Sequence, residues 1–294
     1  MTTKLLSKDA LPIIMTALNE DLGSGDITNK VLFEKDEIVL ADIVAKESCV
    51  LCGIDVARWV FNALDENIVT RPLYKDGSAV KKDKKILSIK GSAKNILTAE
   101  RTALNFLSRL SGVATTTSEF VRKIKGKDTR LFSTRKTMPG MRALDKYAVR
   151  VGEGINHRTN LGDGVLIKDN HLFSLRNRFN AKKIDVIKKA IASFKEKGFK
   201  DIEVEVDNLK EFEAALYNNA DIIMLDNMKL DDIKKAVKLR NKEYSKTGKK
   251  ILIEVSGGVN LESLSKLAAT GVDRISTGFI THSARSIDFS LEIC

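Results

Sequence analysis

The second half of the chain alternates short apolar runs with amphipathic segments, and this constrains the fold more than any other feature. The runs are mostly β-branched, as parallel strands buried on both faces require. Repeated strand–helix units imply a parallel sheet with right-handed crossovers, either open or closed into a barrel. No Gly-x-Gly-x-x-Gly motif follows an early strand, so a dinucleotide-binding open sheet loses support and an α/β barrel is favoured. The expected strands are 165–167, 202–206, 221–225, 251–255 and 274–280, and the expected helices are 184–197, 209–218, 230–244 and 261–270.

The first part of the chain has a different pattern. Strand-like segments are expected at 38–45 and 86–90, with turns at Asp76-Gly77 and Lys90-Gly91, and an amphipathic helix at 97–110 follows. We therefore predict an α+β domain over residues 1–112 and a barrel domain over residues 113–294, with a C-terminal tail that is able to return to the first domain.

Composition narrows the class of protein. A formal net charge of +11 favours polyanionic ligands, and both nucleic acids and phosphorylated metabolites qualify. Aromatic residues make up only 6% of the chain and are not interleaved with clustered cations, which argues against a basic nucleic-acid-binding protein. The sequence lacks both a run of roughly 18 apolar residues and a secretory signal, so we expect a cytoplasmic protein that does not engage membranes. The three cysteines lack zinc-site spacing and are expected to be reduced thiols.

Charged residues stand where the expected strands end. In an α/β barrel the catalytic groups come from these strand ends and the loops after them. Because strand side chains alternate, Glu203, Glu205 and Asp207 are expected on the barrel side of their strand. Buried carboxylates need cationic partners, and the alternative to a binding site is a salt-bridge network that serves only the fold. The other strand-end residues are Arg135, Lys136, Lys168, Asp226, Glu254 and Ser256, of which the three cations are the candidate partners.

Two glycine turns follow the last two strands, at Ser256-Gly257-Gly258 and Ser276-Thr277-Gly278. Backbone N–H groups at such turns bind phosphate, and the loops after the final strands are the usual phosphate site of these barrels. The three histidines, His157, His171 and His282, lie near expected loops, either as structural residues or as catalysts, and none has zinc-site spacing. Cations, carboxylates able to hold Mg²⁺ and a phosphate cradle together suit transfer from an activated sugar phosphate.

A series of ordered motifs extends along nearly the whole chain. The motifs are Glu20-Asp-Leu-Gly-Ser-Gly-Asp-Ile-Thr28, Ala99-Glu-Arg-Thr-Ala-Leu-Asn-Phe106, Thr134-Arg-Lys-Thr-Met-Pro-Gly140, Lys146-Tyr-Ala-Val-Arg-Val-Gly152, Asn156-His-Arg158, Val165-Leu-Ile-Lys-Asp-Asn-His171, Glu203-Val-Glu205, Leu225-Asp-Asn227 and Glu254-Val-Ser-Gly-Gly258. They resemble, in the same order, the motifs of the quinolinate phosphoribosyltransferase family. Their order over so long a stretch makes coincidence implausible.

The resemblance implies an N-terminal α+β open sandwich, an incomplete (β/α) barrel and a homodimer with shared active sites. The implied reaction joins quinolinate to phosphoribosyl pyrophosphate and releases CO₂ and pyrophosphate, giving nicotinate mononucleotide for NAD biosynthesis. By the same likeness, Lys136, Lys168, Glu205 and Asp226 are catalytic, and Glu205 and Asp226 hold Mg²⁺. Quinolinate would be bound by Arg101, Arg135, His157, Arg158 and Lys168, and the 5′-phosphate by Ser256, Gly257, Gly258, Thr277, Gly278 and His282.

One loop departs from the family pattern. Where the family often has Val-Gly-Gly-Gly, this chain has Val151-Gly152-Glu153-Gly154. Because glutamate disfavours a positive φ, we expect only the two glycines to need conformational freedom. Two other enzymes stay open as alternatives: a nicotinate phosphoribosyltransferase, which the number of arginines disfavours, and a pyrophosphorylase associated with molybdenum transport.

Overall fold

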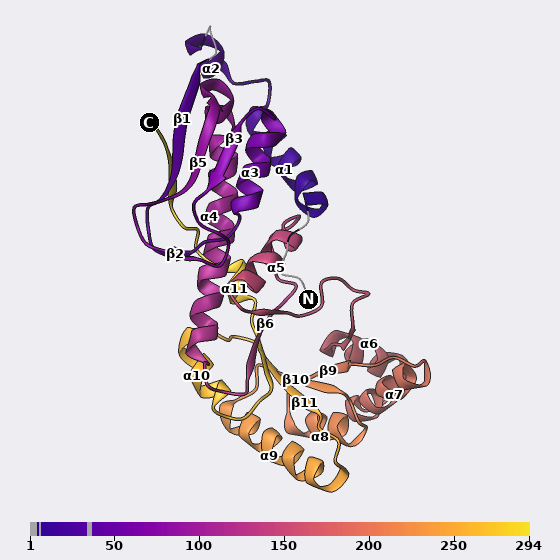
Figure 1. Ribbon diagram of the computed structural model, residues 1–294. Coiled ribbons are helices and arrows are strands. Elements are labelled where there is room, and N and C mark those ends of the chain that lie inside the picture. The colour runs from indigo at the N-terminus through magenta and orange to yellow at the C-terminus, as the bar shows by residue number, and fades with distance from the viewer. Residues whose placement is uncertain (1–4, 6, 34–36) are drawn as a thin grey trace. The chain divides into compact units, whose positions relative to one another are not determined.

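The computed structural model describes residue 5, residues 7–33 and residues 37–294. The chain forms two compact units (Figure 1). The first, called the N-terminal unit, combines residues 1–119, 136–154 and 280–294, and the second, called the barrel unit, combines residues 120–135 and 155–279. Within the described residues, no helix is long and apolar enough to cross a membrane.

The N-terminal unit is built on a four-stranded antiparallel sheet with the order β13-β1-β5-β3. Its edge strand β13 comes from the C-terminal tail and pairs with β1, Ile43 opposite Leu291. Apolar residues of β1 and β5, among them Ile43 and Leu87, are fully buried in the core. The strands are β1 (Ile38–Ala45), β2 (Cys49–Val50), β3 (Val69–Pro72), β4 (Ala79–Val80), β5 (Lys84–Ser92) and β13 (Phe289–Ile293); the helices are α1 (Ser7–Leu22), α2 (Ile27–Leu32), α3 (Ile54–Leu64), α4 (Ala93–Lys123), α5 (Arg142–Val151) and α11 (Phe279–His282).

Two predictions for this unit were wrong, one for the end of a helix and one for a turn. Helix α4 extends well beyond the predicted 97–110, because the buried apolar stripe continues through Val113 and Ala114. Gly112 does not end the helix; a Cβ there would lie 2.0 Å from the backbone oxygen of Arg285, so this glycine permits a close approach. The predicted turn at Lys90-Gly91 is also wrong, since Gly91 is a residue of β5 and pairs with Val39.

The barrel unit is a seven-stranded parallel sheet with the order β7-β6-β12-β11-β10-β9-β8. Figure 1 shows α7, α8 and α9 on one side of strands β9 to β11. Strands β8 and β9 have the predicted bounds, but the predicted strand 274–280 is wrong, because β12 ends at Ser276 before a turn. The strands are β6 (Arg130–Ser133), β7 (Ile155–Asn156), β8 (Val165–Ile167), β9 (Ile202–Val206), β10 (Ile222–Asp226), β11 (Leu252–Ser256) and β12 (Arg274–Ser276); the helices are α6 (Asp169–Phe179), α7 (Lys183–Glu196), α8 (Leu209–Tyr217), α9 (Leu230–Thr247) and α10 (Leu261–Ala268).

The sheet of the barrel unit is curled. Strands β7 and β9 are five positions apart in the sheet order, which corresponds to about 24 Å in a flat sheet. Yet His157, directly after β7, has its Nε2 atom 2.8 Å from Oε2 of Glu203 on β9. The curl stops short of closure, because no pairing joins β7 to β8 among the described residues. The predicted incomplete α/β barrel is therefore confirmed.

The loop that departs from the family pattern contradicts our expectation about its backbone. Glu153 itself has a positive φ of 69°, whereas neither glycine beside it does. The glycines are needed for space: a Cβ on Gly152 would lie 2.4 Å from the backbone oxygen of Ala114, and one on Gly154 would lie 2.7 Å from Cγ2 of Thr117. The backbone of this loop packs against α4, and Glu153 takes the strained conformation that remains.

Candidate active site

Cationic side chains lie at the ends of three strands of the barrel unit. Arg135 follows β6, Arg158 follows β7, and Lys168 follows β8 at the start of α6. Burial lowers the pKa of the Arg158 guanidinium, and the neighbouring charge of Arg135 lowers it further. The Nε atom of Arg135 is buried without a hydrogen-bond partner among the described residues. Two guanidinium groups held close together, one with a free donor, form an environment that an anion would stabilise.

Carboxylates occupy the facing strands of the same unit. Glu205 on β9 and Asp226 at the end of β10 are both half-buried. Burial raises the pKa of Glu205, the charges of Asp226 and Asp169 raise it further, and the charge of Lys168 opposes this. Two carboxylates that repel one another in a partly desolvated site would be stabilised by a divalent cation, and carboxylate oxygens are suitable Mg²⁺ ligands.

Asp207, the third acid of the predicted row, does not join these carboxylates. It lies beyond the end of β9, where strand alternation no longer applies, and its side chain is exposed. Its Oδ2 atom is 3.1 Å from Nζ of Lys183 on α7, and the same lysine pairs with Glu211 on α8 at 2.9 Å. The expectation that Asp207 faces the barrel mouth was therefore wrong.

The two glycine turns pack against neighbouring strand ends. Gly257 has a φ of +87° and lies against Asn227, whose N–H donates to the backbone oxygen of Ser256. In the second turn, the Thr277 hydroxyl donates to the backbone oxygen of Val259, and the Thr277 N–H donates to that of Phe132. The side chain of Thr277 thus ties the two glycine turns together.

His171 has a structural role in the helix that starts at Lys168. Its Nδ1 atom accepts a hydrogen bond of 3.0 Å from the backbone N–H of Lys168. The side chain therefore caps the first turn of α6, where backbone N–H groups have no partner within the helix. This fixes the backbone from which the Lys168 side chain projects.

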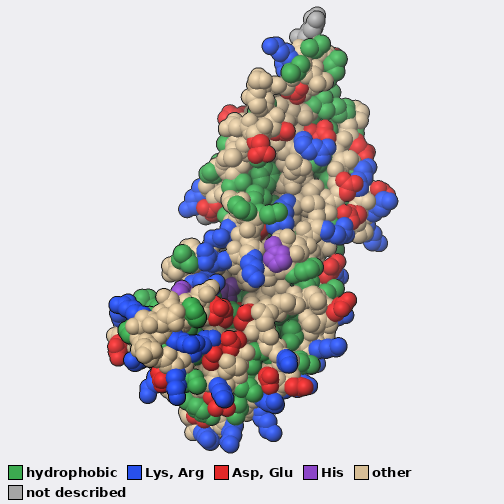
Figure 2. Space-filling view, turned by 180° about the vertical axis from the view of Figure 1, so that it is seen from behind, with side chains coloured by type: hydrophobic (Ala, Val, Ile, Leu, Met, Phe, Trp, Pro, Cys, Tyr) green, Lys and Arg blue, Asp and Glu red, His purple; other side chains and the backbone are tan. Residues whose placement is uncertain are grey.

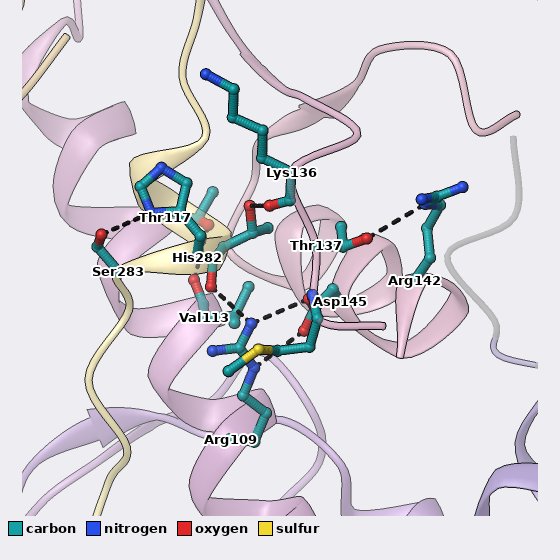
Figure 3. A network of polar contacts seen from close by, with 11 residues as sticks. Arg109, Val113, Thr117, Lys136, Thr137, Arg142, Asp145, His282 and Ser283 are labelled. Carbon is teal, nitrogen blue, oxygen red and sulfur yellow. Dashed lines mark hydrogen bonds and ion pairs between the residues drawn. The ribbon is translucent and has the colours of Figure 1, made fainter. Parts of the chain in front are cut away.

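The other predicted site residues, Arg101, Lys136 and His282, belong to the N-terminal unit and are exposed. A network of polar contacts holds the backbone around Lys136 (Figure 3). The Thr281 hydroxyl donates to the backbone oxygen of Lys136 at 2.7 Å, and Asp145 accepts from the N–H of Met138 at 3.2 Å. In Figure 3 the Lys136 side chain extends away from the Arg109–Asp145 pair.

That pair is the part of the network that sequence reasoning missed. Arg109 donates through Nε and Nη2 to the two oxygens of Asp145, at 3.1 and 3.0 Å, and also to the backbone oxygen of Thr281 at 2.6 Å. Asp145 is fully buried and Arg109 nearly so. The two residues are 36 positions apart, so no local pattern identifies them as partners.

Lys and Arg side chains are spread over the lower part of Figure 2, which is the barrel unit, while a group of Asp and Glu side chains lies together there. On the face drawn in Figure 2, the cations of the barrel unit therefore do not form the single patch or stripe that is typical of a nucleic-acid-binding surface. The barrel unit thus presents a partial α/β barrel whose strand ends carry opposed groups of cations and acids. It has the features of a protein that binds a small, multiply charged ligand.

Comparison with known proteins gives the family. The model of the quinolinate phosphoribosyl transferase C-terminal domain matches residues 113–292, and that of the N-terminal domain matches residues 26–111. The chain belongs to the quinolinate phosphoribosyl transferase family. The resemblance inferred from the motifs is confirmed.

Curated relatives and solved structures agree with this assignment. A probable nicotinate-nucleotide pyrophosphorylase [carboxylating] of Methanocaldococcus jannaschii is 43% identical over 98% of this chain and 99% of its own length. The nicotinate-nucleotide pyrophosphorylase [carboxylating] of Mycobacterium leprae is 38% identical over 95% of each chain. The structure of the nicotinate-nucleotide pyrophosphorylase from Francisella tularensis is 40% identical, with a TM-score of 0.88 over 99% of this chain and 98% of that one.

Proposed function

We propose that this chain transfers the phosphoribosyl group of phosphoribosyl pyrophosphate to quinolinate and releases CO₂, giving nicotinate mononucleotide and pyrophosphate. The observation that carries this proposal is the Arg135–Arg158 pair beside His157. Each guanidinium raises the cost of burying the other, and a planar dicarboxylate would relieve that repulsion through bidentate hydrogen bonds. A substrate with one carboxylate would satisfy this group of cations less completely.

The proposed reaction has two stages, transfer of the phosphoribosyl group and decarboxylation. The ring nitrogen forms a bond to C1 of the ribose while the bond from C1 to the pyrophosphate oxygen breaks. The resulting pyridinium then loses its 2-carboxylate as CO₂, and the electron pair left on the ring carbon is stabilised by the adjacent cationic nitrogen before a proton replaces it. Lys136 and Lys168 are proposed to stabilise the negative charges of the two substrates during these steps, because cations that are already in position need not reorganise.

Glu205 and Asp226 are proposed to bind the ribose hydroxyls and Mg²⁺. Their position on adjacent strands and the raised pKa of Glu205 support this, because a divalent cation would remove the repulsion between them. Bound Mg²⁺ would supply charge neutralisation for the pyrophosphate. The 5′-phosphate is assigned to Ser256, Gly257, Gly258, Thr277, Gly278 and His282.

The test is product analysis with purified protein. Incubation with Mg²⁺, phosphoribosyl pyrophosphate and quinolinate is expected to yield nicotinate mononucleotide, CO₂ and pyrophosphate in equal amounts. The matched control replaces quinolinate with nicotinate and is expected to give no product. Turnover of nicotinate without turnover of quinolinate would overturn the assignment in favour of a nicotinate phosphoribosyltransferase.

We also propose that the chain acts as a homodimer with shared active sites, in which Arg101 contributes to the partner's site. An Arg101→Ala protein mixed with a Lys168→Ala protein should then regain part of the wild-type activity, because one site of each mixed dimer is intact. Failure to regain activity, although subunit exchange is demonstrated, would contradict the sharing of sites.

A further inference from the structure

Two buried carboxylates beneath His157 have no role in the proposed reaction. The Nε2 atom of His157 lies 2.8 Å from Oε2 of Glu203 and 3.9 Å from Oε1 of Glu254. The His157 side chain is 13% exposed, whereas those of Glu203 and Glu254 are 3% and 0% exposed. The imidazole therefore lies nearer the solvent, and the two acids lie behind it in the barrel interior.

The curl of the sheet brings these groups together. Glu203 lies between Ile202 and Val204, both buried, and pairs with Leu166 of β8 and Ile222 of β10. Glu254 lies on β11, and His157 follows the edge strand β7. Strand and loop positions that are far apart in the sheet thus converge on one ring.

Glu203 and Glu254 differ in their contacts with the imidazole. Only Glu203 is within hydrogen-bond distance of Nε2, and a carboxylate accepts, so the ring donates. Both oxygens of Glu254 are buried without a hydrogen-bond partner among the described residues, and Nη1 of Arg274 lies 3.9 Å from Oε2 of Glu254. The Ser276 hydroxyl faces Glu254 but does not make a hydrogen bond of normal geometry.

We propose that Glu203 is a positioning residue for substrate recognition: its hydrogen bond to Nε2 sets the orientation of the His157 ring, and its negative charge favours the imidazolium form, which in turn contacts a carboxylate of the pyridine dicarboxylate. This inference rests on the proposed function. A hydrogen bond at one ring nitrogen fixes the orientation of a histidine, and a binding residue works best when a buried group fixes its rotamer.

Glu254 provides the matched control for a test of Glu203. Burial, and next the charge of Glu203, raise the pKa of Glu254, which favours its protonated form, and glutamine resembles that form. Glu254→Gln and Glu203→Gln are the same isosteric change in the same cluster. Only the second touches the hydrogen bond to His157, and it retains an acceptor oxygen, whereas Glu203→Leu removes the acceptor altogether.

The experiment measures KM for each substrate, kcat and thermal stability in these variants. We expect Glu203→Leu to raise the KM for quinolinate about tenfold or more, the loss typical of a charge-assisted hydrogen bond. Glu203→Gln should restore most of the wild-type KM, and Glu254→Gln should change it less than about threefold. The KM for phosphoribosyl pyrophosphate should stay within about twofold in all three, because a positioning effect on His157 concerns only the dicarboxylate.

A double-mutant cycle separates positioning from a general loss of structure. In a His157→Asn background, Glu203→Leu should raise the KM for quinolinate less than about twofold further, since the residue that it positions is gone. Additive effects of the two substitutions would overturn the proposal. If Glu203→Leu does not fold, Glu203→Ala takes its place, and a KM for quinolinate within about threefold of the wild-type value in that variant would overturn the proposal as well.

A metal ion is the competing explanation for this cluster. The ligand atoms of His157, Glu203 and Glu254 lie within 4.8 Å of one another. One equivalent of a transition metal in the purified protein, lost in both Glu→Gln variants, would overturn the positioning role. Wild-type protein that does not turn over quinolinate would refute the proposed function instead, whereas normal turnover with unchanged KM in the Glu203 variants would refute this inference alone.

Discussion

Gly257 offers a sharp test of how the glycine turn after β11 supports the adjacent strand end. An alanine Cβ at this position would lie 2.3 Å from Oδ1 of Asn227 and 2.8 Å from its backbone nitrogen. Rotation of the Asn227 side chain relieves the first contact but not the second. The turn that carries Asp226 and Asn227 must therefore move. Gly258 is the matched control, because its φ of +58° is also left-handed but the nearest atom to an added Cβ is 4.0 Å away.

The two substitutions should differ in free energy of unfolding. Alanine in a left-handed conformation costs about 1–2 kcal/mol, which is the full expected effect of Gly258→Ala. Overpacking against the Asn227 backbone adds about 1–3 kcal/mol, so Gly257→Ala should cost about 2–5 kcal/mol. Urea denaturation followed by circular dichroism compares the two variants under the same conditions.

Activity should fall as well in Gly257→Ala. Because Asp226 is proposed to bind the ribose and Mg²⁺, its displacement in Gly257→Ala should lower kcat/KM for phosphoribosyl pyrophosphate by about tenfold to a hundredfold. Gly258 is itself assigned to the 5′-phosphate, so the comparison of the two variants depends on their stability. Equal losses of stability in the two variants would refute the argument from close approach.

Two further predictions concern structural residues. Glu153→Gly should stabilise the protein by about 1 kcal/mol, because glycine adopts a positive φ more readily than glutamate does. Gly152→Ala should destabilise the protein by more than about 2 kcal/mol, because its Cβ would contact the α4 backbone. Thermal unfolding of both variants checks this pair, and a destabilised Glu153→Gly would contradict the prediction. Asp273→Asn should cost about 3 kcal/mol at pH 7, because it leaves the buried Arg240 without its 2.6 Å ion pair. Burial raises the pKa of Asp273, but hydrogen bonds from the Ile253 N–H, Lys250 and Arg240 outweigh burial and hold that pKa below its ordinary value. The stabilisation by Asp273 is therefore complete above the unfolded pKa of about 3.9 and disappears as the pH falls through the lower folded value. Urea midpoints of wild type and variant should converge as the pH falls below about 3.9 and through that folded value, and a constant difference across this range would contradict the role of the ion pair.

Much of the barrel unit could be predicted because its elements have strong local patterns. Strands 165–167 and 202–206 have the predicted bounds, since short β-branched runs between helices leave little choice of structure. The end of 274–280 was wrong because Thr277 and Gly278 interrupt an apolar run that continues into α11. Helix α4 was underestimated because the change of pattern near residue 112 was taken as its end, while tertiary packing of the stripe continues the helix.

The candidate site also has features that the sequence predicts and features that it does not. The positions of charges at strand ends follow from the sequence, because strand alternation and the barrel rule are local in origin. The contacts that each polar side chain makes do not follow from the sequence. Asp207 pairs with Lys183 on a helix, and the Thr277 hydroxyl joins the two glycine turns. These outcomes depend on what the next element places opposite each side chain.

By itself, then, the sequence determined the order of strands and helices, the family and the kinds of charge at the strand ends, because these depend on residue patterns within a few positions. Only the tertiary structure decided which charges meet. The contact between His157 and Glu203 exists because the sheet curls and brings β7 to β9, and the Arg109–Asp145 pair exists because α4 packs on α5. Sheet curvature and helix packing arise from the sum of many weak contacts, so no short stretch of sequence specifies them.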